Sequence, residues 1–164
     1  MSIRSAYSAS HAFSTNGYLD KDLGPVECRE REFAFFVEQA HKSGGPVLEL
    51  ASGAARVLMV LARAGFRVVG LEASRTMLQI ATKATTRLIL CEQKNIRLVQ
   101  GDMCSFHFMR PFPLIIVPYN SFWFNFDRWG NYRENNIETE PNFANKCLEC
   151  IMNNLAPRGR FIVD

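Results

Sequence analysis

Two segments, Val47-Leu-Glu-Leu-Ala-Ser-Gly-Ala-Ala-Arg56 and Val68-Val-Gly-Leu-Glu-Ala-Ser74, carry the strongest structural signal in this chain. Each contains a short apolar run, the first ending in small residues and the second in a carboxylate, with a helical pattern between them. Glu72 lies 19 residues after Gly53. This spacing is typical of a strand, a tight turn, a helix and a second strand that bring an acidic side chain to the ribose hydroxyls of a bound nucleoside. Because small residues let a ligand lie against the backbone, we expect a site for an adenosine-containing cofactor here.

The composition is that of an ordinary single domain. The chain has 164 residues, of which 48% are hydrophobic and 21% charged. The net charge is only +3 and no run of five Lys or Arg occurs, so nucleic acid is not an expected partner. No apolar stretch approaches the roughly 18 residues that a membrane span needs, and the first 20 residues lack the apolar block of a signal peptide. We therefore expect a cytoplasmic protein without a membrane segment.

The cysteines do not form a disulfide or metal-binding pattern. An odd number of scattered thiols predicts reduced cysteines. The pair Cys147-Leu-Glu-Cys150 lacks the second pair, or the two histidines, that a zinc site requires, so no metal site is predicted. The five positions are Cys28, Cys91, Cys104, Cys147 and Cys150.

Strands alternate with helices along the chain, which predicts an α/β fold built on a parallel, doubly wound sheet. The expected strands are residues 47–50, 67–71, 96–100, 114–117 and 160–163, and the expected helices are residues 26–42, 55–64, 75 onward towards 90, and 142–155. Ser74 is a good N-cap and Gly65 a good C-cap. Residues 156–159 read as a turn, residues 119–140 as a long aromatic and polar loop, and residues 1–24 as a flexible or lid-like arm that precedes a domain at residues 25–164.

At four places in order the chain resembles the successive motifs of class I S-adenosylmethionine-dependent methyltransferases. The residues that carry the resemblance are Leu48-Glu-Leu-Ala-Ser-Gly-Ala-Ala-Arg-Val57, Val69-Gly-Leu-Glu-Ala-Ser74 with Met77-Leu78, Leu98-Val-Gln-Gly-Asp-Met103 and Leu155-Ala-Pro-Arg-Gly-Arg160. The match covers roughly residues 25–164. The resemblance implies a Rossmann-like, mostly parallel sheet with strand order 3-2-1-4-5 and S-adenosyl-L-methionine as cofactor.

The resemblance also implies roles for single residues. Glu49 and the turn 51–55 would line the methionine end of the cofactor, and Glu72 would accept hydrogen bonds from both ribose hydroxyls. Asp102 would receive the adenine amino group, with Met103 beside the ring. The segment 118–121 would face the transferred methyl group, with Tyr119 and Asn120 as candidate catalytic residues. The full set of expected cofactor-binding residues is Glu49, Ala51, Ser52, Gly53, Arg56, Glu72, Ala73, Met77, Gly101, Asp102, Met103 and Pro118.

Two departures from the family pattern stand out. Ala51 and Ala55 occupy positions where the family often has glycine. The chain also ends at Asp164, directly after the fifth expected strand, whereas the family fold continues through two more strands. We therefore expect a truncated form of the fold, with a second copy or a partner chain covering the exposed edge of strand five.

Several site residues have a structural interpretation beside the functional one. Glu49 in an apolar strand should be hydrogen-bonded near the cofactor rather than chemically active. Asp102 could simply form a turn, and Tyr119 and Asn120 could shape a loop. His107 lies between two phenylalanines and is expected to be structural. The aromatic side chains Trp123, Phe124, Phe126 and Trp129 could close over a sulfonium by cation–π contact or pack the loop onto the core.

The leading functional hypothesis is an S-adenosylmethionine-dependent methyltransferase that acts on a small molecule. The first alternative is a lyase or hydrolase that degrades S-adenosylmethionine. The second is a non-catalytic subunit that uses the fold for cofactor binding or assembly.

Overall fold

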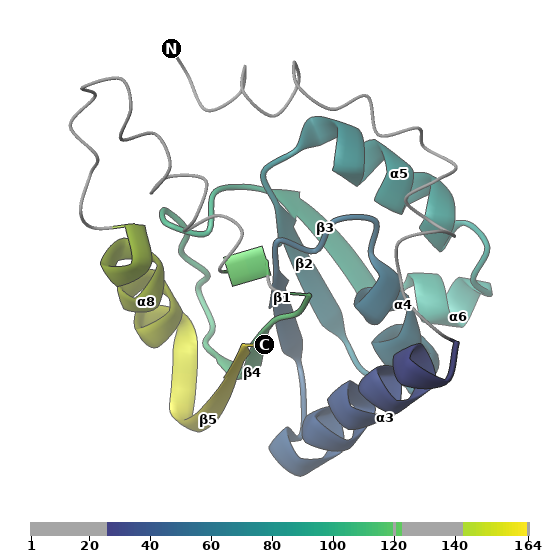
Figure 1. Cartoon of the computed structure of the whole chain (residues 1–164), viewed down its shortest axis with the longest axis horizontal. Helices are drawn as coiled ribbons and strands as arrows, with labels where there is room; N and C mark the ends of the chain where they lie inside the picture. The colour runs from purple at the N-terminus through teal and green to yellow at the C-terminus, as the bar shows by residue number, and fades with distance from the viewer. Residues whose placement is uncertain (1–25, 120, 123–142, 164) are drawn as a thin grey trace.

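The computed structural model describes residues 26–119, 121–122 and 143–163. Its centre is a five-stranded sheet in which every strand pair is parallel, with the order β3-β2-β1-β4-β5 (Figure 1). The strands are β1 (Val47–Leu50), β2 (Val68–Glu72), β3 (Ile96–Gln100), β4 (Phe112–Val117) and β5 (Leu155–Val163). The predicted α/β class and strand order are confirmed.

Helices cover both faces of this sheet. One apolar cluster joins the sheet to α3 (Val26–Ser43), α4 (Arg56–Arg63) and α5 (Arg75–Thr85). The other joins the opposite face to α8 (Phe143–Asn154) and to the connection between β3 and β4 (Figure 1). A sheet buried on both faces needs central strands that are apolar throughout. This explains the run Val47-Leu-Glu-Leu50, in which all four residues are buried.

The helix after β2 is shorter than expected. We predicted that it would continue towards Leu90, but α5 ends at Thr85 and a separate short helix, α6 (Leu90–Gln93), follows. Near the end of α5, the hydroxyls of Thr82, Thr85 and Thr86 donate to carbonyls three or four residues earlier. Such local bonds compete with a regular helix, and β-branched residues propagate it poorly.

The pairing of β4 with β5 is also less regular than the sequence indicated. β4 begins at Phe112, two residues before the predicted start, and contains Pro113. Phe112 pairs with Leu155, but the next pair is Leu114 with Arg160, so Pro113 alone faces residues 156–159. Proline cannot donate to a strand ladder, and a bulge accommodates it. The predicted turn at residues 156–159 is therefore wrong as a separate element, because it forms an irregularity inside β5.

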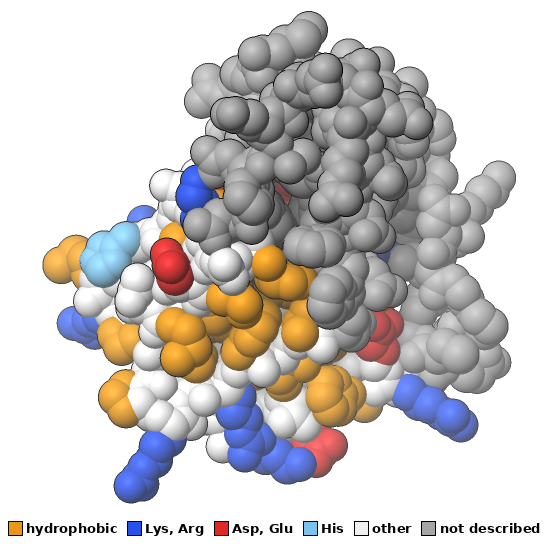
Figure 2. Space-filling model, turned by 60° about the vertical axis from the view of Figure 1, so that its left-hand side comes forward, with side chains coloured by type: hydrophobic (Ala, Val, Ile, Leu, Met, Phe, Trp, Pro, Cys, Tyr) orange, Lys and Arg blue, Asp and Glu red, His pale blue; other side chains and the backbone are white. Residues whose placement is uncertain are grey.

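β5 is the terminal strand of the sheet on the side of α8. Figure 2 turns this side of the molecule forward and shows apolar side chains gathered on it. The large exposed hydrophobic residues of α8 and β5 are Leu148, Met152 and Val163. The expectation that another chain covers this edge stays a prediction.

Within the described ranges, no helix combines the length and the apolar character that crossing a membrane would require.

Candidate functional site

The turn between β1 and α4 has an unusual backbone. Ala51, Gly53 and Ala55 all have positive φ angles, of 53°, 53° and 64°. The turn is closed by the Ala55 N–H, which donates to the Ser52 carbonyl at 2.9 Å, and Ala55 is the N-cap residue of α4. Alternating left-handed residues fold the chain tightly at the carboxyl end of β1. Because the turn contains only alanine, serine and glycine, its small side chains leave room for a ligand beside the backbone.

Glu72 ties this turn to the next strand. Its carboxylate is only 6% exposed and accepts hydrogen bonds from the Gly53 N–H at 2.9 Å and from the Ser74 N–H at 2.8 Å. Burial raises the pKa of Glu72, although the N–H groups of Ser74, Gly53 and Ala73 oppose that rise. Each carboxylate oxygen can accept more than one hydrogen bond, so the sugar-binding role that we predicted stays compatible with these contacts.

The segment after Glu72 begins α5 as predicted. The Ser74 side chain accepts a hydrogen bond from the Met77 N–H at 3.3 Å, which confirms Ser74 as the N-cap. Ala73 is exposed and Met77 is partly buried. Their predicted contacts with the cofactor stay predictions.

The segment after β3 approaches the same edge of the sheet. The Gly101 N–H donates to the Glu72 carbonyl at 3.1 Å, and a Cβ at Gly101 would lie 2.6 Å from the Leu71 side chain. Asp102 accepts from the Cys104 N–H through its side chain at 2.8 Å, and Met103 is buried. Asp102 therefore does form the turn that we gave as its structural interpretation. Its role towards adenine stays a prediction.

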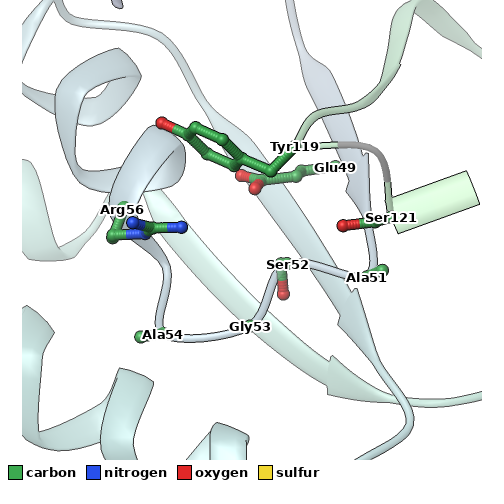
Figure 3. A pocket seen from close by; sticks show the side chains of 8 residues that line it. All are labelled: Glu49, Ala51, Ser52, Gly53, Ala54, Arg56, Tyr119 and Ser121. Carbon is green, nitrogen blue, oxygen red and sulfur yellow. The ribbon is translucent and has the colours of Figure 1, made fainter. Parts of the chain in front are cut away.

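A pocket of about 60 Å³ lies between the β1–α4 turn and the end of β4 (Figure 3). This volume suits one end of a ligand rather than a whole nucleoside, since sites for whole ligands span about 300–1,000 Å³. The pocket brings together six of the single residues predicted for the site, together with Ala54 and Ser121 from the predicted segments 51–55 and 118–121. The six are Glu49, Ala51, Ser52, Gly53, Arg56 and Tyr119. The other predicted residues do not line it, and Asn120 and the aromatic residues 123–129 lie outside the described residues.

Glu49 is the most unusual side chain in this pocket. It is 2% exposed, and its Oε2 atom has no hydrogen-bond partner among the residues that the structure describes. Burial raises the pKa of Glu49 to about 8. The positive charge of Arg56 and the Leu58 N–H oppose this rise, and the negative charge of Glu72 adds to it. A buried oxygen without a partner is costly, and such atoms mark positions where a ligand or water completes the bonding.

Tyr119 forms the wall of the pocket opposite the β1–α4 turn. Its ring lies over the guanidinium of Arg56, with 4.4 Å between Cζ and the ring centroid. Its backbone has a φ of 63°, a conformation that costs energy for a bulky residue and is often found at functional sites. Figure 3 shows the ring beside the Glu49 carboxylate. The geometry assigns Tyr119 a role in shaping the pocket, and its predicted catalytic role stays a prediction.

Gly70 explains how the turn packs onto the sheet. A Cβ at this position would lie 2.7 Å from the Ser52 hydroxyl oxygen and 2.4 Å from the Leu58 side chain. A side chain at position 70 would therefore displace the Ser52 and Leu58 side chains, and glycine lets the turn and the start of α4 lie this close to β2. Figure 3 shows the Ser52 hydroxyl turned away from Glu49.

Sequence reasoning missed the contacts that hold the segment after Asp102. Asn154, at the end of α8, is 1% exposed; it accepts from the Phe108 N–H at 2.7 Å and donates to the carbonyls of Cys150 at 2.7 Å and Phe106 at 3.4 Å. The Cys104 thiol forms a hydrogen bond with Cys147 of α8, and this contact and burial raise the pKa of Cys104. The sequence signal for these contacts was an asparagine near the end of the predicted helix 142–155. His107, in the same segment, is exposed.

Comparison with known proteins identifies the family of this chain. A family described as a methyltransferase domain matches residues 47–134, which is more than half of the chain. No curated protein gives a match.

Among solved structures, a glycopeptide N-methyltransferase complexed with sinefungin is 25% identical, with a TM-score of 0.61, covering 80% of this chain and 47% of that one. An amino pentose methyltransferase from Micromonospora echinaspora, solved with S-adenosylmethionine bound, is 21% identical with a TM-score of 0.60 over 81% of this chain and 49% of that one. An S-adenosylmethionine-dependent methyltransferase from Clostridium acetobutylicum is 18% identical with a TM-score of 0.61 over 92% and 54%.

The chain thus spans about half the length of these structures. The family match and the shared fold confirm the predicted family. The chain belongs to the methyltransferase-domain family and has the Rossmann-like fold of S-adenosylmethionine-dependent methyltransferases.

Proposed function

We propose that the chain binds S-adenosylmethionine and takes part in the transfer of its methyl group to a small-molecule acceptor. The observation that carries this proposal is the pocket at the carboxyl end of β1, where the buried carboxyl group of Glu49 and the guanidinium of Arg56 lie beside a turn of small residues. The α-ammonium and α-carboxylate of a methionine group are the complementary charges. Ligands of open α/β sheets bind at this same edge.

The residues present fit this cofactor. Glu49 offers a buried oxygen that lacks a partner among the described side chains and would hold the ammonium group. Glu72 would hold the sugar, from a position fixed by two backbone N–H groups. When bound, S-adenosylmethionine supplies a methyl group that its sulfonium already activates, so the protein contributes mainly position and exclusion of water.

A small-molecule acceptor is the finer part of the proposal. Two of the similar structures are named as a glycopeptide N-methyltransferase and an amino pentose methyltransferase. The acceptor would approach from the segment that follows β4, where Tyr119 and Ser121 line the pocket. A general base is needed only for an acceptor that arrives protonated.

Calorimetric titration with S-adenosylhomocysteine tests the site. We expect binding by the wild-type chain and at least a tenfold loss of affinity in Glu72→Gln, because an amide removes the charge and one of the two acceptor oxygens. Glu38→Gln is the matched control, since Glu38 is exposed and pairs only with Lys42 among the interactions described for it. Equal affinity in wild type and Glu72→Gln would contradict the assignment of the sugar site.

Incubation with S-adenosylmethionine tests the reaction class. Transfer of a labelled methyl group to a component of a metabolite extract, detected by mass spectrometry, would support the proposal. Release of methylthioadenosine without an acceptor would instead indicate the lyase or hydrolase alternative, and binding without turnover would indicate the non-catalytic one.

A further inference from the structure

The immediate surroundings of Glu49 do not suit a carboxylate ion. Glu49 lies on the same face of β1 as Val47, which packs with α3 and α4 in a wholly apolar cluster. An ionised carboxylate in such a place is stable only with strong partners. Its Oε2 atom has none among the described residues, although the Leu58 N–H approaches the carboxyl group.

The charges around Glu49 come from two elements and oppose each other. Arg56, at the start of α4, favours the ionised form, and Glu72, at the end of β2, disfavours it. β4 leads to the uncharged phenol of Tyr119, and α3 contributes Phe33, Phe36 and Val37 to the same face. The charges of Arg56 and Glu72 therefore do not compensate the Glu49 carboxyl group for its lost hydration. Burial has the largest effect on its protonation.

We propose that Glu49 is a neutral carboxylic acid in the ligand-free protein and that binding the cationic amino end of the cofactor releases this proton to solvent. This inference rests on the proposed function for the identity of the ligand. The exchange balances: the carboxyl O–H bond breaks, its proton leaves to water, and the carboxylate that remains accepts hydrogen bonds from the incoming ammonium group. The ammonium supplies the positive charge that none of the described residues places at Oε2.

The consequence for recognition is a preference for cations. A ligand that carries an amide or hydroxyl in place of the ammonium could bond to Oε2 but would not stabilise the ionised form. The pocket would therefore distinguish ligands by charge and not only by hydrogen bonding.

The first measurement is the proton release on binding S-adenosylhomocysteine, from calorimetry in buffers that differ in ionisation enthalpy. The pKa of about 8 for Glu49 corresponds to release of roughly 0.9 proton at pH 7. Affinity should also rise roughly tenfold from pH 6 to pH 7. Glu49→Gln should release no proton and lose this pH dependence, whereas Glu38→Gln should behave like the wild type.

The second measurement needs no ligand. Carbon NMR of the protein labelled at glutamate carboxyl groups should show one resonance with a midpoint near pH 8, absent from Glu49→Gln. Should that variant fail to fold, the buffer series on the wild type decides the question alone.

The outcomes are distinguishable. Binding with less than about 0.2 proton released, or a Glu49 midpoint near its ordinary 4.5, would overturn this inference and leave the proposed function standing. Absence of any binding would overturn both.

Discussion

Ala51 and Ala55 hold backbone conformations that glycine adopts without strain. Their φ angles of 53° and 64° place each methyl group against the following carbonyl oxygen, which costs about 1–2 kcal/mol per residue. From the sequence, these alanines were only a departure from the family pattern. The structure shows that the β1–α4 turn keeps its left-handed conformation although two of its residues are alanines. The rest of the fold therefore compensates for the backbone strain at these two residues.

Replacing Ala51 with glycine should stabilise the protein. Ala51→Gly relieves the strained φ, and the larger entropy of glycine in the unfolded chain offsets part of that gain, leaving about 0.5–1 kcal/mol. Urea unfolding measures the difference.

Ala73→Gly is the control for this change, because Ala73 is exposed and its φ is not positive. It should lose stability by about 0.5–1 kcal/mol. A loss of stability in both variants would show that strain at Ala51 is negligible.

At the level of helices and strands, Asn154 joins two elements that belong to different parts of the chain. Its side chain, at the end of α8, satisfies the Phe108 N–H and the Phe106 carbonyl in the connection between β3 and β4. That connection begins with Asp102, so α8 supports one side of the expected adenine site.

Removing this side chain should be costly. Asn154→Ala removes the hydrogen bonds from this side chain to the Phe108 N–H and the Phe106 carbonyl, which predicts a loss of about 2–3 kcal/mol in the free energy of unfolding. Asn153→Ala on the exposed face of the same helix is the matched control and should change stability by less than about 0.5 kcal/mol. Similar losses in the two variants would mean that only helix propensity is involved.

The elements that could be predicted are those whose signal is local. The run Val47–Leu50 and the residues of β3 have no competing interpretation, and Ser74 can cap a helix wherever one follows. The start of β4 was misplaced because Pro113 argues against a strand, and only the partner β5 reveals the bulge that admits it. The contacts of Asn154 join residues 46 and 48 positions apart, which no local pattern encodes.

The candidate site was predictable to a similar degree. The spacing of Glu72 from Gly53 predicted a unit of strand, tight turn, helix and strand, and the structure has this unit, with Glu72 accepting from the Gly53 N–H at 2.9 Å. Its second bond, to the Ser74 N–H, and the unpaired oxygen of Glu49 depend on side-chain packing and needed the structure.

For the molecule as a whole, buried carboxyl groups set how stability depends on pH. The pKa of Glu49 is raised from 4.5 to about 8, so between these values the folded state binds more protons than the unfolded state. The stability that this group contributes is fully present below pH 4.5 and is lost as the pH rises through 8. Burial raises the pKa of Glu72 too, which acts in the same direction.

The free energy of unfolding should therefore fall as the pH rises from 5.5 to 7.5. Glu49 alone contributes up to about 1.4 kcal/mol per pH unit to this fall. Urea unfolding at several pH values should give a shallower dependence for Glu49→Gln, while the exposed Glu38→Gln should follow the wild type. Parallel curves for wild type and Glu49→Gln would contradict the neutral state of this side chain.

The double attachment of Glu72 has a consequence for redesign. Because the Glu72 carboxylate holds the segments that follow two neighbouring strands, a substitution meant to change the proposed sugar contact would also free both segments. Engineers who wish to change the nucleoside should therefore leave this anchor in place and reshape the residues on either side of Gly53 and Ser74.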